Sequence, residues 1–314
     1  MQGILFLILG LAVFSVQDVI MKHFSDQLAL QQVIFLRGLV TIVVIALLLA
    51  RHGRLSAFSA RRPVLCIVRG FAGFACFTSF SMALAVLPLA DAMPLYYTSP
   101  LFVMALAVPL LGETVGWRSW LSILVGFAGV ILVARPSAEG LEPGMVLAIA
   151  AALAYAIQSL LARALGPTES ALGMTFYSQL TFIASSGFLG LAFGNGWLDQ
   201  IDHPSAQYLF RAWSTPTLDQ AALIIALGLI AAAGFYCISQ AYRLGQASTV
   251  APFEYSSLPF ALLWGWLIWS SVPTAASLIG GGLIIASGLY IMYREMLRKR
   301  RTASAVTTAA EAHS

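Results

Sequence analysis

One apolar stretch of the chain reads Leu87-Pro88-Leu89-Ala90-Asp91-Ala92-Met93-Pro94-Leu95-Tyr96-Tyr97-Thr98-Ser99-Pro100-Leu101-Phe102. It carries three prolines, a carboxylate and two tyrosines, which a lipid-facing helix has no reason to hold. Each proline leaves a helix carbonyl without its backbone donor, and hydrocarbon cannot satisfy that carbonyl. The stretch therefore predicts a broken helix that lines a hydrated interior, with helix breaks at Pro94 and Pro100.

A partner stretch lies in the second half of the chain, between Ala247 and Phe260. Laid on residues 89–102, it repeats a proline, a tyrosine, a serine and a phenylalanine. The matched pairs are Pro94 with Pro252, Tyr97 with Tyr255, Ser99 with Ser257 and Phe102 with Phe260. Paired broken helices around a central site are typical of transporters built from internal repeats. The second stretch therefore predicts helix breaks at Pro252 and Pro259.

The composition is that of a protein that crosses a membrane many times. Of the 314 residues, 60% are hydrophobic and 10% charged, whereas soluble domains average about 45–50% and about 25%. A soluble fold could not bury so much apolar surface. The net charge of +4 comes from basic residues between the apolar runs, so no nucleic-acid partner is expected.

No motif for catalysis, metal binding or cofactor binding is found. The sequence has no Walker loop, no HExxH and no GxSxG, and its four histidines lie in loops or in the tail. Its three cysteines, Cys66, Cys76 and Cys237, lie in apolar runs without the spacing of metal ligands. We expect no catalytic residue, no metal and no cofactor.

Ten runs reach the roughly 20 apolar residues that a membrane-spanning helix needs. They lie near residues 3–21, 29–50, 64–86, 89–111, 117–134, 144–163, 171–194, 219–242, 247–270 and 274–293. Loops on the side of the N-terminus, together with the C-terminal tail, hold twelve arginines and lysines, against three in the loops on the other side. Positive charge favours the cytoplasm, so both termini are predicted to be cytoplasmic, in a bacterial inner membrane. The longest outer loop, 195–218, is predicted to carry a short helix at 206–210.

The repeat extends beyond the broken helices. Residues 3–24 match residues 144–165, with Gln17 over Gln158 and Phe14 over Tyr155. Because five spans separate each matched pair, the second copy is inverted in the membrane. The predicted fold is an all-α membrane protein of ten transmembrane helices in two inverted five-helix repeats. These repeats occupy residues 1–135 and 144–295, followed by a disordered cytoplasmic tail at 296–314.

The motifs resemble those of the drug/metabolite transporter superfamily, EamA type. Leu87-Pro88-Leu89-Ala90-Asp91-Ala92, Ser99-Pro100-Leu101-Phe102 and Leu111-Gly112-Glu113 are similar to its first repeat. Its second repeat is matched by Ala241-Tyr242-Arg243, Val250-Ala251-Pro252-Phe253 with Tyr255, and Gly288-Leu289-Tyr290 with Arg294-Glu295. One departure is that the second repeat has Ser270-Ser271-Val272-Pro273 where the first has Gly112-Glu113. The resemblance implies ten helices, cytoplasmic termini and metabolite movement without ATP.

Arg37 is the ionisable residue placed deepest in a predicted span, about 12 Å from its start at 1.5 Å per residue. A charge at that depth costs about 2.5–3.5 kcal/mol on insertion scales, so Arg37 should face the interior and have a partner. Two interpretations stay open. Arg37 either anchors a carboxylate, phosphate or carbonyl of a substrate, or forms a structural ion pair within the bundle.

Glu254 is the carboxylate well inside a span of the second half, beside Pro252 and Tyr255. Such a residue suits proton coupling, and the alternative is a permanent pair with Arg37. Asp18 and Asp91 lie near the outer ends of their spans and are interpreted as caps or gate residues.

Neutral side chains complete the predicted substrate site. Tyr96, Tyr97, Tyr155 and Tyr255 offer ring faces to a planar ligand. Gln17 and Gln158 occupy matched repeat positions and offer hydrogen-bond donors and acceptors.

The sequence predicts an inner-membrane secondary transporter that moves a small polar or amphipathic metabolite by alternating access. The resemblance to the EamA-type transporters leaves an amino acid, S-adenosylmethionine and a riboflavin-like molecule open as substrates. The alternative is a channel, or a non-transporting membrane protein of the same fold. Membrane lipid is an expected partner, and the oligomeric state is left open, with a monomer among the possibilities.

Overall fold

The computed structural model describes residues 2–51, 60–112, 117–134, 142–166, 168–169, 171–198, 201–244 and 251–312. Within these ranges the chain is helical and has no β-strand. The elements are α1 (Gln2–Phe24), α2 (Leu30–Arg51), α3 (Pro63–Leu84), α4 (Leu89–Tyr96), α5 (Ser99–Leu111), α6 (Trp117–Ala134), α7 (Pro143–Leu165), α8 (Ala171–Phe193), α9 (Pro204–Phe210), α10 (Leu218–Leu244), the 3-10 helix η2 (Ala251–Ser256), α12 (Ser257–Trp269) and α13 (Ala275–Ala312). Helices α3, α7 and α9 each begin with a proline, where the missing N–H leaves no helical hydrogen bond unmade.

Nine of the ten predicted runs return, in the described part of the chain, as helices long and apolar enough to cross a membrane. They cover Gln2–Phe24, Leu30–Leu47, Pro63–Leu84, Leu89–Leu110, Trp117–Ala134, Pro143–Leu165, Gly173–Phe193, Leu218–Ile238 and Ala275–Arg294. The remaining run, 247–270, is divided between η2 and α12, and its residues 247–250 lie outside the described residues. The chain is a multi-pass membrane protein.

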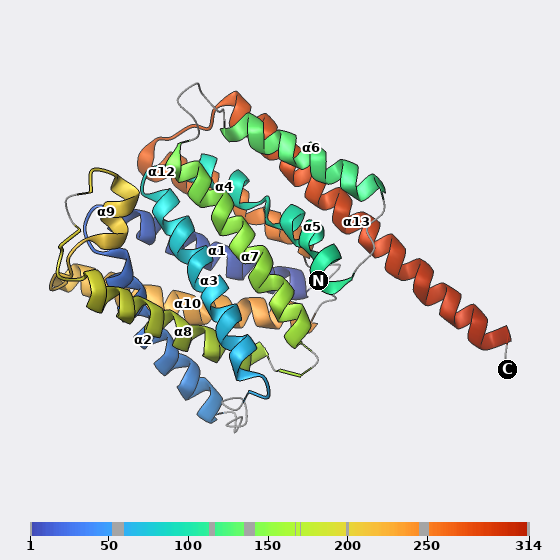
Figure 1. Cartoon of the computed structure of the whole chain (residues 1–314), viewed down its shortest axis with the longest axis horizontal. Helices are drawn as coiled ribbons and strands as arrows, with labels where there is room; N and C mark the ends of the chain where they lie inside the picture. The colour runs from blue at the N-terminus through green and yellow to red at the C-terminus, as the bar shows by residue number, and fades with distance from the viewer. Residues whose placement is uncertain are drawn as a thin grey trace.

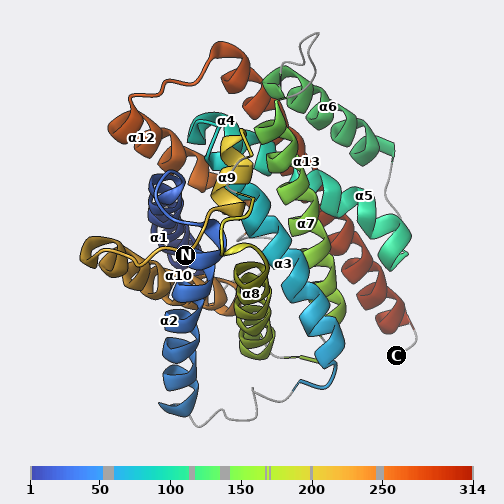
Figure 2. The ribbon, with the colours of Figure 1, turned by 60° about the vertical axis from the view of Figure 1, so that its left-hand side comes forward.

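Helices from the two halves of the chain pack in pairs. Helix α1 packs on α10, α3 on α7, α2 on α8 and α6 on α13. Figure 1 and Figure 2 both show α6 running alongside α13, and α3 alongside α7. At the α6–α13 crossing, a Cβ atom added to Gly129 would lie 2.7 Å from the carbonyl oxygen of Gly280. Small residues therefore let these two backbones touch, as in other membrane bundles.

The two broken helices have matching ends. Helices α5 and α12 are both 13 residues long, and their N-caps Thr98 and Ser256 have φ/ψ of −71°/−11° and −68°/−8°. The hydroxyl of Thr98 donates to the carbonyl of Leu95 at 2.7 Å, and the hydroxyl of Ser256 donates to that of Phe253 at 2.6 Å. The breaks therefore fall at Tyr97–Thr98 and at Tyr255–Ser256, between the prolines rather than at them. Pro94 stays inside α4, and Pro100 lies in the first turn of α5.

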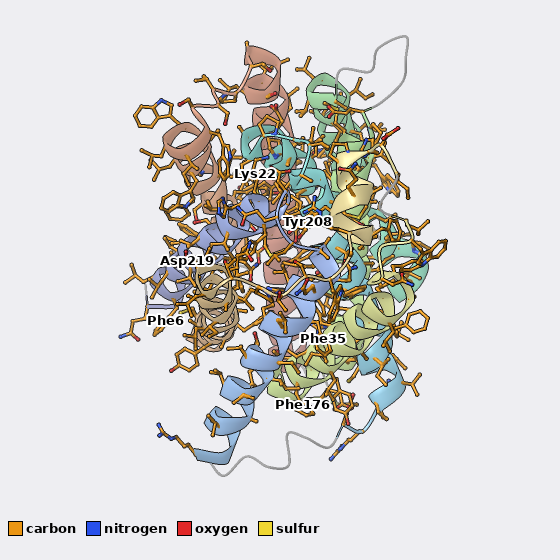
Figure 3. All side chains as sticks on the ribbon, turned by 90° about the vertical axis from the view of Figure 1, so that its left-hand side faces the viewer. Phe6, Lys22, Phe35, Phe176, Tyr208 and Asp219 are labelled. Atoms are coloured by element: carbon orange, nitrogen blue, oxygen red, sulfur yellow. The ribbon has the colours of Figure 1, made fainter. Side chains whose placement is uncertain are left out.

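The loop before α10 contains the short helix that the sequence predicted, α9, and it covers one end of the bundle. Tyr208 is fully buried, and its hydroxyl donates to the carbonyl of Met21 at 3.0 Å. Ser205 donates to the carbonyl of Met82 at 2.8 Å, which ties α9 to α3 as well as α1. Nearby, Lys22 donates to the carbonyls of Leu84 and Leu87 at 2.6 Å each. Figure 3 labels Lys22 and Tyr208 at this end of the molecule.

Helix α13 continues as far as Ala312, beyond the rest of the bundle (Figure 1). This differs from the disorder predicted for residues 296–314. The segment contains several alanines and long basic residues, which have high helix propensity.

Candidate functional site

Four tyrosines from both halves of the chain form one cluster, which we call the tyrosine cluster. Tyr96 ends α4 and Tyr97 follows it, whereas Tyr155 lies on α7 and Tyr255 on η2. The ring centroids lie 6.1 Å apart for Tyr96–Tyr97, 5.6 Å for Tyr96–Tyr155 and 5.2 Å for Tyr97–Tyr255. Phe80 of α3 adds a fifth ring, 4.9 Å from Tyr96. The matched tyrosines of the two broken helices, Tyr97 and Tyr255, are therefore direct neighbours.

Glu254 belongs to the same cluster. Its backbone carbonyl accepts a hydrogen bond from the Tyr97 hydroxyl at 3.3 Å, which joins the two broken helices. Its half-buried carboxylate lies within electrostatic range of the hydroxyls of Tyr97, Tyr155 and Tyr255. The carboxylate predicted for coupling and the tyrosines predicted for binding are thus in one place.

Tyr255 is held by its contact with α13. A Cβ atom added to Gly288 would lie 1.8 Å from the Tyr255 hydroxyl oxygen, so only a glycine leaves room for that hydroxyl. The Tyr255 hydroxyl is buried without a hydrogen-bond partner, whereas that of Tyr97 has Glu254.

Arg37 lies in the interior and has a partner from another helix, as its depth predicted. Its side chain is 6% exposed, and its Nη1 atom donates to Oε1 of Gln17 on α1 at 2.8 Å. The guanidinium also lies over the ring of Phe77, 3.9 Å from the centroid. The carboxylate whose charge acts on Arg37 is Asp18, whereas Glu254 interacts with the tyrosines.

Asp18 connects the two groups of predicted residues. Its charge acts on Arg37 and also on Tyr97. From its position near the end of its span, Asp18 was predicted to be a cap or gate residue. Because Asp18 directly follows Gln17, a predicted site residue, the sequence did contain a signal that Asp18 lies near the interior site.

Gln158 of α7 packs against α3. A Cβ atom added to Gly73 would lie 2.9 Å from the Gln158 amide nitrogen. On the same α3 helix, Arg69 donates to the Ser178 hydroxyl of α8 at 2.8 Å. Of the predicted residues, the structure therefore brings together the tyrosines with Glu254, and separately Arg37 with Gln17.

The arrangement can bind and orient a small molecule through ring faces, hydroxyls, amides and charges of both signs. In the described part of the chain, no group of three or more His, Cys, Asp or Glu residues is placed to hold a metal ion. A multi-pass helical bundle with this polar and aromatic interior has the features of a membrane transporter.

Several known proteins are similar in sequence to most of this chain. The EamA-like transporter family matches residues 1–135 and 142–293. The S-adenosylmethionine uptake transporter of Rickettsia bellii (strain RML369-C) is 27% identical over 293 residues, covering 93% of this chain and 94% of that protein. The riboflavin transporter of Rhizobium johnstonii is 30% identical over 220 residues, covering 70% of this chain and 67% of that protein. The pseudopaline exporter of Pseudomonas aeruginosa (strain UCBPP-PA14) is 27% identical over 287 residues, covering 91% of this chain and 94% of that protein.

The chain belongs to the EamA-like transporter family, which confirms the resemblance that its motifs carry. Its role is to transport a small metabolite, so its ligand is a small molecule.

Proposed function

We propose that the protein is a secondary carrier that moves its metabolite by alternating access between two inverted five-helix repeats. In this proposal the tenth span is formed by η2 and α12 together with residues 247–250. The matching caps of α5 and α12 support the repeat. The helix packing also supports it. In the proposed repeat α1 corresponds to α7 and α10 corresponds to α3, and α1 packs on α10 as α7 packs on α3.

The substrate site in this proposal lies between the repeats. It comprises the tyrosines 96, 97, 155 and 255, with Gln17, Gln158 and Arg37 contributing polar contacts and Glu254 contributing a charge for coupling. The single observation that carries the proposal is the contact between Tyr97 and Tyr255, one from each half. A movement of one repeat against the other would separate these rings, and so would change access to the ligand.

The breaks beside the prolines have a role in this proposal. Pro94 and Pro100 flank the first break, and Pro252 and Pro259 flank the second. Unpaired backbone groups near such breaks can contact a ligand, provided that they lie inside the bundle.

The carrier is proposed to lie in the bacterial inner membrane, with both termini cytoplasmic. The loop charges support this orientation. Single cysteines at Arg54 and at Gln207, in a Cys-free background, should differ in labelling by an impermeant maleimide. Labelling at Gln207 and none at Arg54 in intact cells is the expected result, and the reverse would overturn the orientation.

The substrate class is proposed to be a small metabolite with a planar heteroaromatic part. S-adenosylmethionine and riboflavin, named for two relatives, both contain fused heteroaromatic rings. The tyrosine rings provide matching surfaces. Neither ATP nor a chemical step is required, because the carrier would only bind its substrate and change conformation.

Reconstituted vesicles test the function directly. Purified protein should give saturable uptake of radiolabelled S-adenosylmethionine or riboflavin, and excess unlabelled compound should block it. Uptake that rises linearly with concentration and resists competition would contradict a carrier. A thermal-shift screen with amino acids, nucleosides, flavins and S-adenosylmethionine narrows the substrate, because a bound ligand raises apparent stability.

A further inference from the structure

Neighbouring rings of the tyrosine cluster are tilted against one another and are not stacked in parallel. The planes of neighbouring rings meet at 62° for Tyr96–Tyr97, 65° for Tyr96–Tyr155 and 52° for Tyr97–Tyr255. In such edge-to-face and tilted contacts, the edge of one ring lies against one face of its neighbour. Tyr96 and Tyr155 retain partial exposure although both pack against the main core cluster. Part of the surface of these two rings is therefore open to contact with a ligand group.

The negative faces of aromatic rings attract cations, with energies of about 0.5–2 kcal/mol per contact. The cluster adds a carboxylate to these rings, because the charge of Glu254 reaches Tyr97, Tyr155 and Tyr255. Asp18 adds a second negative charge near Tyr97. Rings and carboxylates together form the environment that recognises an organic cation.

The arginines nearest this cluster have contacts of their own. Arg37 donates to Gln17, lies over Phe77 and is opposed by Asp18. Arg69 donates to Ser178 on α8, although its charge also reaches Tyr155. The charges of these two arginines therefore lie toward α2 and α8, whereas Glu254 lies on η2.

We propose that the tyrosine cluster with Glu254 is the subsite for a positively charged group of the substrate, such as a sulfonium or a quaternary ammonium attached to a planar ring system. This inference rests on the proposed function, because it names the substrate class of the same central site. The carrier then distinguishes cationic metabolites from neutral ones of nearly equal shape.

Two pairs of probes isolate the charge. S-adenosylmethionine and S-adenosylhomocysteine differ by one methyl group and the sulfonium charge, and N1-methylnicotinamide and nicotinamide differ by one methyl group and the pyridinium charge. Binding to the purified full chain is measured by thermal shift and by equilibrium titration. In each pair that binds, the cation should bind about tenfold more tightly than the neutral partner, the ratio that one desolvated cation–aromatic contact supports.

Substitutions test whether the preference for the cation over the neutral probe arises at the tyrosine cluster. Glu254→Gln keeps shape and removes the charge, so the cation-to-neutral ratio should fall close to one. Glu142→Gln is the matched control, an exposed carboxylate before α7, and should keep the wild-type ratio. Tyr155→Leu removes a ring face and should lower the ratio as well, which keeps the test available if Glu254→Gln fails to accumulate.

The outcomes separate this inference from the proposed function. If the neutral probes bind as tightly as the cations, if neither cation binds, or if Glu254→Gln leaves the ratio unchanged, the cation subsite is overturned. Saturable uptake of neutral metabolites such as riboflavin would then still support the carrier. If no compound in the screen shows saturable uptake by reconstituted vesicles, the proposed function itself fails.

Discussion

The two broken helices share a backbone conformation and differ in the chemistry that they present. Helices α5 and α12 start after hydroxyl residues with nearly equal backbone angles and end in a left-handed residue. At the position aligned with Tyr96, however, the second half has Glu254. Helix α2 carries Arg37, whereas α8 contains neither arginine nor lysine. The two broken helices therefore have a similar backbone around an asymmetric interior, in which the first half supplies Arg37 and the second half supplies Glu254.

The cation and the carboxylate also differ in how tightly they are enclosed. Arg37 is buried and bonded to Gln17, and Glu254 is half-buried among tyrosines. A buried charge that loses its counter-charge is costly, and an exposed one less so. The first half should therefore depend on its charge for folding, and the second half should depend on its charge for ligand binding.

The largest expected effect comes from Arg37→Met. It removes the donor to the buried Gln17 amide oxygen and the positive charge near Asp18, which should lower stability by about 3 kcal/mol, the upper end of the cost of a buried polar group left without its partner. Glu254→Gln should accumulate close to wild type. Accumulation in the membrane, measured by quantitative immunoblotting and fluorescence-detected size exclusion, checks the contrast.

A double variant identifies the partner of Arg37. Arg37→Met with Asp18→Asn should restore accumulation without restoring transport, and the single losses should be non-additive. Rescue by Arg37→Met with Glu254→Gln, and not with Asp18→Asn, would show instead that Glu254 is the structural partner of Arg37.

Some contacts in the interior could be predicted from the sequence, and others could not. Matched prolines and tyrosines predicted that Tyr97 and Tyr255 share a site, because a repeat relates residues far apart in the chain. The bond between Arg37 and Gln17 could not be predicted in the same way, because it depends on the rotation of α1 against α2. Asp18 was placed at a helix end by depth alone. Tyr208 was predicted to lie in the short helix of the outer loop, but its complete burial was not predicted. The roles of all these residues in transport stay predictions.

The Tyr97 hydroxyl has a hydrogen-bond partner, whereas the Tyr255 hydroxyl is buried against Gly288 without one. The second prediction tests this packing of Tyr255. Gly288→Ala places a Cβ atom 1.8 Å from the Tyr255 hydroxyl oxygen, so the ring must move away from its site. Overpacking of this kind costs about 1–3 kcal/mol, and transport should fall with it. Gly282→Ala is the matched control on the same helix, because an added Cβ there meets nothing within 4 Å.

Removal of the hydroxyl sharpens this test. Tyr255→Phe should partly restore the thermal stability of Gly288→Ala, because the nearest clashing atom is gone and the next ring atom lies 2.9 Å away. An equal loss of stability in Gly282→Ala and Gly288→Ala would mean that the Tyr255 contact has no special part in the effect.

The prolines give a smaller effect, on transport rather than on stability. Pro94→Ala restores a backbone N–H inside α4 and allows the helix to run more regularly into Tyr97. The protein should still accumulate, and its initial uptake rate should fall by about threefold to tenfold, the size expected when a site is slightly misplaced. Pro252→Ala should act likewise in the second half.

Pro109 is the matched control for Pro94. It also lies inside a helix, α5, but it is exposed and far along the chain from the break. Pro109→Ala should leave uptake close to wild type. Equal uptake in Pro94→Ala, Pro252→Ala and Pro109→Ala would remove support for a functional role of the two breaks.

The smallest effect concerns the ends of α5 and α12, where the same left-handed turn is made by different residues. Gly112 has φ 66° and Ser270 has φ 50°, a region that costs a residue with a side chain about 1–2 kcal/mol and a glycine almost nothing. Ser270→Gly should therefore raise the apparent melting temperature, and Gly112→Ser should lower it, each by an amount equivalent to about 1 kcal/mol. An added Cβ at Gly112 meets nothing within 4 Å, so its cost reports the backbone alone. Because the two sites make no shared contact, the double variant should melt close to wild type. Lower stability in Ser270→Gly would mean that the serine stabilises this turn by a contact that outweighs its strained backbone.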